Sequence, residues 1–378
     1  MSEFGQAVRH FWTLDWSAAH LNHGSYGATP KPVLAAQDTV RQEMERTIGD
    51  FFTRQLPGRM RAAAAELAGY LGADADDVVF VDNATAGMQS VLGSIDLKAG
   101  DEILINDQTY NAVKNIARYE AGRVGAKVVE ITLPFPVEDD GDSIVEAFKT
   151  GLSPRTRLVL LDHITSATAV VMPVQRLIAL SRDVGALVLV DGAHAPGQVD
   201  LDLATLGADF YTGNCHKWLA APKGAAFLWA KREHQSWLHP PVVSHGLGKG
   251  FIAEFDWTGT RDPSSYLAVP AALAFRQTFG DSRIKSHNRA LADEAGTYLA
   301  DAWKTRLGSP ASLAGSMRMI KLPLSTGAPP DIRLKLWQDH RIDVPVNALA
   351  DGLWVRISAQ LYNEMDDYRR LATAIRSL

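Results

Sequence analysis

The chain has 378 residues, longer than a single hydrophobic core usually grows, so we expect one large domain and a smaller one. Its hydrophobic content of 46% and charged content of 21% are ordinary for a soluble globular enzyme. The net charge of −5 and the absence of a basic run argue against nucleic-acid and anionic-membrane partners. No apolar stretch is long enough to cross a bilayer and no signal pattern begins the chain, so we expect a cytoplasmic protein.

Cysteine and histidine usage limits the metal and redox chemistry. Cys215 is the only cysteine, which excludes intramolecular disulfides and cysteine-based metal clusters. The 11 histidines lack the paired spacing of a zinc site. We therefore predict no metal.

The first three quarters of the chain alternate between strand-like and helix-like segments. A glycine-rich loop at 21–27 precedes a helical region over 33–72, in which Leu56-Pro57-Gly58 predicts a break. Apolar strands that alternate with helices predict a mostly parallel sheet with helices on both faces. The expected strands are 78–81, 102–105, 127–130, 158–161 and 186–190, and the expected helices are 86–94, 111–123, 143–150 and 174–184.

Beyond about residue 250 the pattern changes to that of a smaller α+β domain. A loop at 256–263 leads into a long helical stretch near 266–305, and strands near 317–323 and 353–358 flank a helix at 331–340. We expect a large domain over 20–255 and a small domain formed by 1–19 with 256–378.

Lys217 and Asp191 form the most informative pair in the sequence. Asp191 ends a buried strand, and Lys217 follows on a loop of small residues. This is the pair that a pyridoxal phosphate enzyme needs, because the lysine forms a Schiff base with the aldehyde and the carboxylate keeps the pyridine nitrogen protonated. A solvated lysine after a strand is the competing interpretation.

Several polar residues could hold the cofactor phosphate. Asn83-Ala84-Thr85 opens a helix, whose free N–H groups and positive dipole end attract an anion, although a plain helix cap would have the same sequence. Asn214 and His216 lie close to Lys217 and could add donors. The Gly259-Thr260-Arg261 loop could supply further backbone and hydroxyl donors.

Four other side chains are candidates for the cofactor ring or the substrate. Tyr110 follows a strand and could cover one face of a planar cofactor, or simply pack half-buried. His163 and Ser166 could reach the cofactor hydroxyl or the substrate, but a structural histidine is an equal alternative. Arg356 could clamp an amino-acid carboxylate with two hydrogen bonds, or form an ordinary salt bridge.

With these residues in view, the chain resembles the class V aminotransferase family of fold-type I pyridoxal phosphate enzymes, and within it the isopenicillin N epimerase-like proteins. The matching motifs occur in the family's order across nearly the whole chain. They are Leu21-Asn22-His23-Gly24-Ser25-Tyr26-Gly27, Asn83-Ala84-Thr85, Asp162-His163-Ile164-Thr165-Ser166, Val190-Asp191-Gly192-Ala193-His194-Ala195-Pro196-Gly197, His216-Lys217-Trp218, Pro222-Lys223-Gly224, Gly259-Thr260-Arg261, Arg356-Ile357-Ser358 and Tyr362-Asn363.

The resemblance implies a role for each matching residue. Lys217 would be the Schiff-base lysine, Asp191 the partner of the pyridine nitrogen, and His194 a neighbour of the 3-hydroxyl. Family members are usually homodimers with shared active sites, so Thr260 would reach the phosphate of the neighbouring subunit. The full assignment is catalysis by Lys217, Asp191, Tyr110 and His163, cofactor binding by Ala84, Thr85, Tyr110, Ser166, Asp191, His194, Asn214, His216, Lys217 and Thr260, and substrate binding by Asn22 and Arg356.

The reaction itself stays open at this point. A persulfide-forming cysteine desulfurase is disfavoured, because those enzymes carry a nucleophilic cysteine late in the chain and none follows Cys215 here. The resemblance favours an epimerase-like conversion of an amino acid, with a C–S lyase or an aminotransferase as the alternative. A non-catalytic pyridoxal phosphate-binding protein and a sugar aminotransferase are disfavoured, since neither needs the carboxylate clamp at Arg356.

Overall fold

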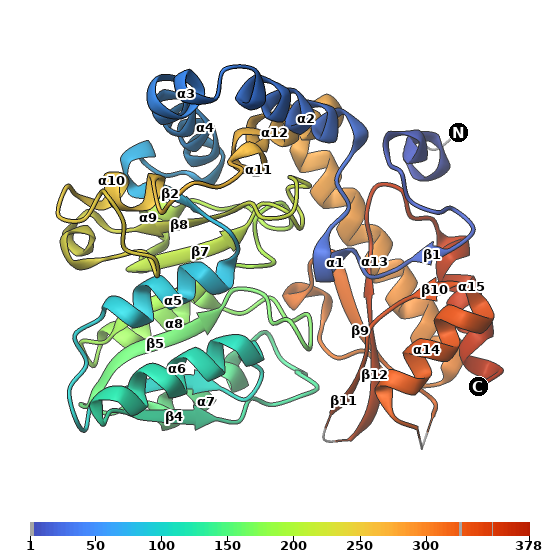
Figure 1. The fold of residues 1–378 in the computed structure, drawn as a ribbon. Helices are drawn as coiled ribbons and strands as arrows, with labels where there is room; N and C mark the ends of the chain where they lie inside the picture. Colours follow the sequence, from blue (N-terminus) through green and yellow to red (C-terminus); the bar gives the residue numbers. More distant parts are fainter. Residues whose placement is uncertain (1–3, 325–326, 350) are drawn as a thin grey trace.

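The computed structural model describes residues 4–324, 327–349 and 351–378. A large α/β part and a smaller α+β part lie side by side, as Figure 1 shows. The α/β architecture with a mostly parallel sheet is confirmed. The expected domain limits remain a prediction.

The large part is built on a seven-stranded sheet in the order β2-β8-β7-β6-β5-β3-β4. Strand β8 runs antiparallel to the other six strands, which all run in one direction. The strands are β2 (Val78–Val81), β3 (Glu102–Asn106), β4 (Lys127–Ile131), β5 (Thr156–Asp162), β6 (Leu187–Asp191), β7 (Phe210–Asn214) and β8 (Ala226–Ala230). The sequence analysis did not identify β7 and β8. The short helix α9 (Leu203–Leu206) precedes β7, and no helix separates β7 from β8, so the alternation that marks the other strands is missing there.

Helices cover both faces of this sheet. One face packs against α5 (Ala84–Ser94), α6 (Asn111–Val124) and α10 (Phe251–Asp256), and the other packs against α4 (Leu56–Leu71), α7 (Asp142–Gly151) and α8 (Val174–Arg182). Along β5, Leu158 and Leu160 join the first core while Val159 and Leu161 join the second. Burial on both faces explains why this strand is a continuous apolar run in the sequence.

Two predicted helical regions are divided differently from expectation. The first consists of α2 (Lys31–Arg46), α3 (Ile48–Asp50), a π-helical segment Phe51–Gln55 and then α4. The helical backbone is not interrupted at the predicted break, 56–58, but it changes there from the π-helical segment to α4, with Pro57 in the first turn of α4. The long stretch near 266–305 is three helices, α11 (Ser264–Leu267), α12 (Val269–Phe279) and α13 (Asp281–Trp303), and α12 contacts α2 and α4 of the large part.

The small part is an antiparallel sheet in the order β11-β12-β9, packed against three helices. Its elements are β9 (Met317–Lys321), α14 (Pro329–His340), β11 (Val346–Leu349), β12 (Gly352–Ser358) and α15 (Met365–Arg376), together with α13. The N-terminal strand β1 (Ala19–His20) pairs in parallel with β10 (Ile342–Asp343), which ties the start of the chain to this part. The remaining helical segments are Gly5–Phe11, α1 (His23–Tyr26), Ala75–Asp77, Arg232–Trp237 and Ala311–Leu313.

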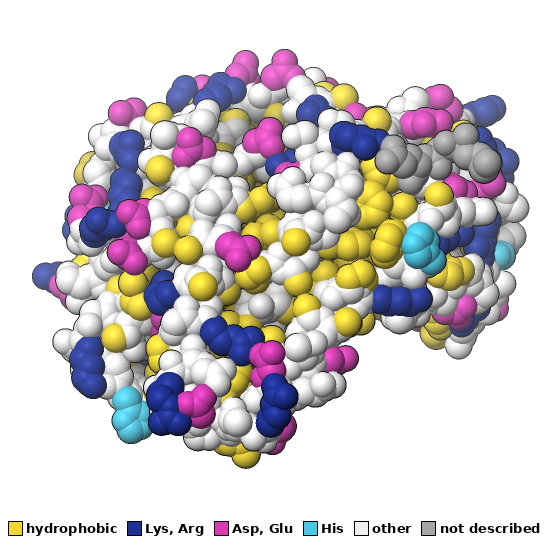
Figure 2. All heavy atoms as spheres, turned by 90° about the horizontal axis from the view of Figure 1, so that it is seen from above, with side chains coloured by type: hydrophobic (Ala, Val, Ile, Leu, Met, Phe, Trp, Pro, Cys, Tyr) yellow, Lys and Arg dark blue, Asp and Glu magenta, His cyan; other side chains and the backbone are white. Residues whose placement is uncertain are grey.

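The surface is of mixed polarity. Figure 2 shows charged side chains of both signs around the rim of the upper face, with hydrophobic side chains gathered along its middle. Within the described residues, no helix is both long and apolar enough to span a membrane.

Candidate active site

The site lies where three parallel strands of the large sheet end. The carboxyl ends of β5, β6 and β7 meet at one edge, beside the N-terminus of α5, which is the usual place for a ligand in an open α/β sheet. A cavity of about 390 Å³ opens there. Its wall brings together nine of the predicted residues, Ala84, Thr85, Tyr110, Ser166, Asp191, His194, Asn214, His216 and Lys217.

Lys217 reaches this cavity from the loop after β7. Burial, helped by the positive charge of Arg356 and opposed by Asp191, lowers the pKa of Lys217 to about 8. The amine is therefore available as a nucleophile or base close to neutral pH. Gly27 underlies this loop, because a Cβ there would come within 2.1 Å of the His216 carbonyl oxygen, and its φ of +71° suits glycine.

Asp191 ends β6 and is buried. Its Oδ1 accepts a hydrogen bond of 2.9 Å from the backbone N–H of Ala193. Burial raises the pKa of Asp191, while the charge of Lys217 opposes the shift. A bound cation such as a protonated pyridine nitrogen would keep the carboxylate ionised.

Asp162 is a cavity residue that the sequence analysis did not assign to the site. It ends β5 directly beside Asp191 in the register of the sheet, and both residues line the cavity. Burial and the neighbouring charge of Asp191 raise the pKa of Asp162. Its position at the end of a buried parallel strand, like that of Asp191, was the signal in the sequence.

The N-terminus of α5 forms the anion-binding end of the cavity. Asn83 caps the helix through a 2.9 Å hydrogen bond from Ala86 N–H, and Ala84 N–H donates to Asn214 Oδ1 at 2.9 Å. Among the described residues, neither the N–H nor the hydroxyl of Thr85 has a hydrogen-bond partner. These two donors and the amide N–H₂ of Asn214 suit a phosphate group.

His216 lines the same cavity, but its protonation state differs from the expected one, in which it donates a hydrogen bond to the phosphate. Its Nδ1–H donates to the Ala225 carbonyl at 3.1 Å, and burial lowers the pKa of His216 to about 4. The ring is thus neutral with an unprotonated Nε2. It would donate to a phosphate only after taking up a proton, which a dianion nearby favours.

A second cavity of about 490 Å³ adjoins the first and contains Arg356. The two share Ser25, Tyr26, Tyr110, Ser166 and Lys217. Tyr110 is 49% exposed between them, at the start of α6, in a position to cover a planar ligand.

His163 is not in either cavity. It is buried, and its Nδ1 is hydrogen-bonded to the Tyr211 hydroxyl at 2.8 Å. It contributes instead to a separate cavity with Met172 and Asp200. His163 directly follows the last residue of β5 and its side chain turns away from Asp162, so it contacts the site only through its backbone N–H, which donates to the Asp191 carbonyl at 2.8 Å.

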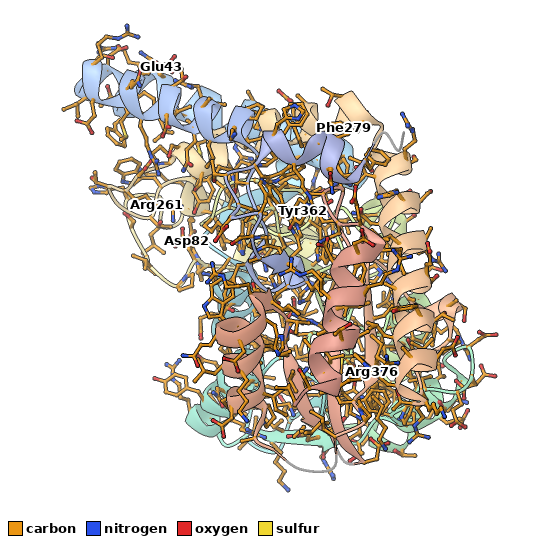
Figure 3. All side chains as sticks on the ribbon, turned by 90° about the vertical axis from the view of Figure 1, so that its right-hand side faces the viewer. Glu43, Asp82, Arg261, Phe279, Tyr362 and Arg376 are labelled. Atoms are coloured by element: carbon orange, nitrogen blue, oxygen red, sulfur yellow. The ribbon has the colours of Figure 1, made fainter. Side chains whose placement is uncertain are left out.

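Asn22 and Thr260 also lie outside the two cavities. Asn22 donates to Asp343 Oδ1 at 3.1 Å and accepts from the hydroxyl of Ser25, and among the described residues this serine is what links its side chain to the site. Thr260 is exposed. Its neighbour Arg261 pairs with Asp82 at 2.7 Å, as Figure 3 shows, which holds the loop beside the start of α5.

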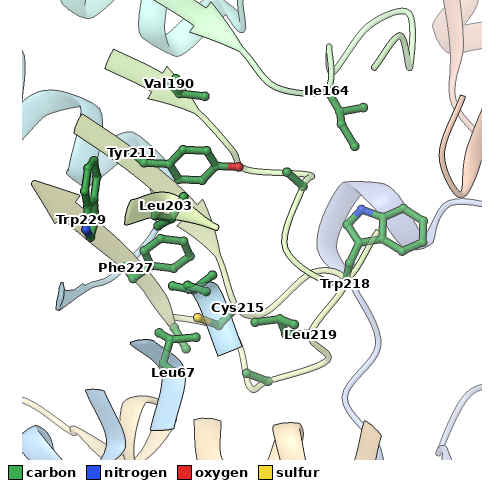
Figure 4. Close-up of a cluster of buried hydrophobic side chains, with 14 of the residues drawn as sticks. Leu67, Ile164, Val190, Leu203, Tyr211, Cys215, Trp218, Leu219, Phe227 and Trp229 are labelled. Atoms are coloured by element: carbon green, nitrogen blue, oxygen red, sulfur yellow. The ribbon is translucent and has the colours of Figure 1, made fainter. Parts of the chain in front are cut away.

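Two other groups bear on metal and thiol chemistry. Asp209, Glu233 and His234 could converge on a metal, but Asp209 is already paired with Lys231 at 2.9 Å. Cys215 is buried in a hydrophobic cluster with Leu67 and Phe227 (Figure 4), and burial raises the pKa of its thiol far above the ordinary value.

Comparison with known proteins decides the family. The model of the family described as aminotransferase class V matches residues 29–371. The chain belongs to the class V aminotransferase family.

Two curated relatives of this family member carry different activities in their names. An isopenicillin N epimerase from Amycolatopsis lactamdurans is 37% identical over 97% of this chain and 96% of its own. An L-cysteine desulfhydrase from Arabidopsis thaliana is 37% identical over 95% of this chain and 87% of its own. Among solved structures, the apo cysteine desulfurase from Thermococcus onnurineus NA1 has a TM-score of 0.81 at 20% identity, with full coverage of both chains, which shows a shared fold.

The protein is a pyridoxal phosphate-dependent enzyme. The residues present fit that cofactor. The free donors of Thr85 suit its phosphate, Asp191 suits its ring nitrogen, and the depressed pKa of Lys217 suits attachment to its aldehyde. When bound, the cofactor withdraws electrons from the Cα of an attached amino acid.

Proposed function

We propose that this enzyme removes the α-proton of an amino acid through Lys217 while Arg356 binds the α-carboxylate. Epimerisation at Cα is the first candidate outcome, and elimination of a sulfur group from Cβ is the second. The observation that carries the proposal is that the buried guanidinium of Arg356 has no carboxylate partner among the described residues.

Arg356 is a buried cation that has no carboxylate partner among the described residues. It donates to the Ser166 carbonyl and, at 3.0 Å, to the Ser25 hydroxyl, while its buried Nε–H is left without a partner. Burial lowers the pKa of Arg356 to about 10. A buried unpaired charge is costly, and the carboxylate of an amino acid in the adjoining cavity would neutralise it with two-point geometry.

Lys217 supports the proposal as the base. Lys217 is the only lysine among the five residues that the two cavities share. Its lowered pKa allows its amine to take up a proton near neutral pH. His194 Nε2 lies 3.2 Å away and orients it. Asp191 would pair with a protonated ring nitrogen of the bound cofactor and hold its positive charge.

The two outcomes differ in what they require beyond the base. Epimerisation needs a second proton donor on the opposite face, and two residues that carry a hydroxyl group, Tyr26 and Tyr110, line both cavities. Elimination needs a leaving group on Cβ and no second donor. The isopenicillin N epimerase relative supports the first and the L-cysteine desulfhydrase relative supports the second. Transamination remains the less supported alternative.

We further propose a homodimer in which Thr260 completes the partner's phosphate site. Thr260 is exposed and its loop is held by Arg261 beside Asp82. Earlier in the chain, before α10, the side chains of Val242, Val243 and Leu247 are each more than half exposed. A largely apolar cavity of about 560 Å³ lies between α4 and α10. Apolar surface of this kind is typical of a protein interface. The cytoplasmic location expected from the sequence stays a prediction.

The test is an exchange and product screen in D₂O. The purified enzyme is incubated with L- and D-amino acids, including cysteine, and Lys217→Ala serves as the control. Deuterium at Cα with loss of chirality supports epimerisation, pyruvate with sulfide supports elimination, and a keto acid with an amino form of the cofactor supports transamination. No deuterium and no product with any amino acid would contradict the proposal and favour a binding protein without turnover.

A further inference from the structure

Arg333 is a second arginine in the wall of the cavity of about 490 Å³ that contains Arg356, called the substrate cavity below. It projects from α14 of the small part, while Arg356 comes from β12. Lys114 and Lys217 also line this cavity, and Asp107 is the only carboxylate among its lining residues. The cavity therefore has more positive charge than one α-carboxylate neutralises.

Among the described residues, the charge of Arg333 is unpaired, unlike that of Lys114 in the same cavity wall and that of Arg341 on the same helix. Lys114 pairs with Glu130 at 2.7 Å, and Arg341, at the end of α14, pairs with Asp15 at 2.7 Å. Within the described part of the chain, the guanidinium of Arg333 makes neither a hydrogen bond nor an ion pair. It is exposed on the side of the helix that opens into the cavity.

We propose that Arg333 binds a second carboxylate, at the far end of the substrate side chain, so that the preferred substrates are amino acids with an anionic side-chain terminus. This inference rests on the proposed function, because it assigns the α-carboxylate to Arg356. Two guanidinium groups at different points of one cavity fix both ends of such a molecule. A neutral side chain would leave Arg333 solvated and gain nothing from it.

The expected effect is modest because Arg333 is exposed. Ion pairs between accessible groups contribute up to about 1 kcal/mol, which corresponds to about a fivefold change in a binding constant. The preference for a second carboxylate should also weaken with added salt, since exposed charges are screened.

The test uses ligands that have no amino group and so cannot react with the cofactor. Binding of glutarate and of its half-amide, glutaramate, to the pyridoxal phosphate-loaded protein is measured by calorimetry. The native protein should bind glutarate about fivefold more tightly than glutaramate. Arg333→Gln should remove this difference without changing the affinity for glutaramate, and Arg333→Lys should restore part of it.

Lys335→Gln is the matched control, because Lys335 lies on the same helix, is exposed, and does not line the cavity. An equal loss of the glutarate preference in Lys335→Gln would mean that any positive charge on this helix produces it, and would overturn the assignment of Arg333. A glutarate preference that survives Arg333→Gln, while Arg356→Gln weakens both ligands, would overturn this inference and leave the proposed function standing. Unchanged binding of both ligands in Arg356→Gln would instead contradict the proposed carboxylate clamp itself.

Discussion

The amine of Lys217 lies 3.2 Å from Nε2 of His194, and the other ring nitrogen, Nδ1, lies 3.5 Å from the indole nitrogen of Trp218. An indole N–H only donates, so Nδ1 is the acceptor and the ring proton of the neutral imidazole is on Nε2. Burial lowers the pKa of His194 well below its ordinary value, which keeps the ring neutral. Nε2–H then points at Lys217 and favours the unprotonated amine. The contact with His194 and the burial of the amine therefore both favour the unprotonated form of Lys217.

The first prediction concerns the pH dependence of cofactor attachment. Because the pKa of Lys217 is lowered to about 8, its amine is protonated and unreactive below that pH, and attachment to the apoprotein should accelerate as the pH rises towards it. The rise is measured through the visible absorption of the attached cofactor. In Trp218→Phe, Nδ1 of His194 can carry the ring proton, and Nε2 can then accept a hydrogen bond from the protonated amine of Lys217. The pH at the midpoint of the rise in attachment rate should therefore be higher in this variant. Rates that do not change between pH 6 and 9 would contradict this account.

The second prediction separates the two buried carboxylates. Asp191→Asn keeps an acceptor for the Ala193 N–H but removes the negative charge, so turnover should fall by orders of magnitude with the fold retained. Asp162→Asn is the matched control. Since the pKa of Asp162 is raised, the native acid is largely neutral and asparagine resembles it, so most activity should remain. Circular dichroism and steady-state rates check both variants, and near-normal turnover of Asp191→Asn would remove Asp191 from the mechanism.

The third prediction tests the carboxylate clamp. Arg356→Lys keeps a positive charge but loses the planar two-point geometry, so amino-acid binding should weaken by about 1–3 kcal/mol. Amines of the same shape without the carboxylate should bind almost as before. The measurement is a titration of each ligand against the loaded enzyme by absorbance. Equal losses for amino acids and amines would indicate that Arg356 serves the structure through Ser166 and Ser25.

The fourth prediction concerns His163 and stability in acid. Burial lowers the pKa of His163 to about 4, below its ordinary value of 6.5, so on acidification the unfolded chain takes up the proton first. The stability associated with the neutral ring is complete above pH 6.5 and is lost between pH 6.5 and about 4, by up to about 3 kcal/mol.

His163→Asn lacks this titration, so its thermal midpoint should fall less steeply than that of the native protein over the same pH range, as measured by scanning calorimetry. Shifts from Asp162 and Asp191 are common to both proteins and cancel in the comparison. Parallel curves for the two proteins would show that His163 is not buried in the neutral form.

The fifth prediction addresses the shared site. Thr260→Ala should weaken retention of the cofactor, and Lys217→Ala should be inactive. If Thr260 completes the partner's site, a hybrid of the two variants has one site with both native residues, so mixtures should regain activity. Sedimentation verifies the hybrids. A fully active monomer, or hybrids without activity, would exclude this arrangement.

Much of this protein is determined by short-range information in its sequence. The strand that ends at Asp191 and the loop that carries Lys217 are recognisable because apolar runs bounded by small and polar residues have few other structures available to them. The family follows from a match over residues 29–371, and nine predicted site residues meet in one cavity. That convergence follows from topology, since parallel strands present their carboxyl ends at one edge.

Other features depend on contacts between distant segments, and only the tertiary structure decided them. His163 follows β5 directly, yet it turns towards Tyr211 and away from the cavity, whereas Asp162, one residue earlier, faces it. In a strand, neighbouring side chains point to opposite faces, so a one-residue difference in where the strand ends moves a side chain out of the site. The unpaired charges of Arg356 and Arg333 are likewise invisible in the sequence, because a missing partner is a property of the folded neighbourhood.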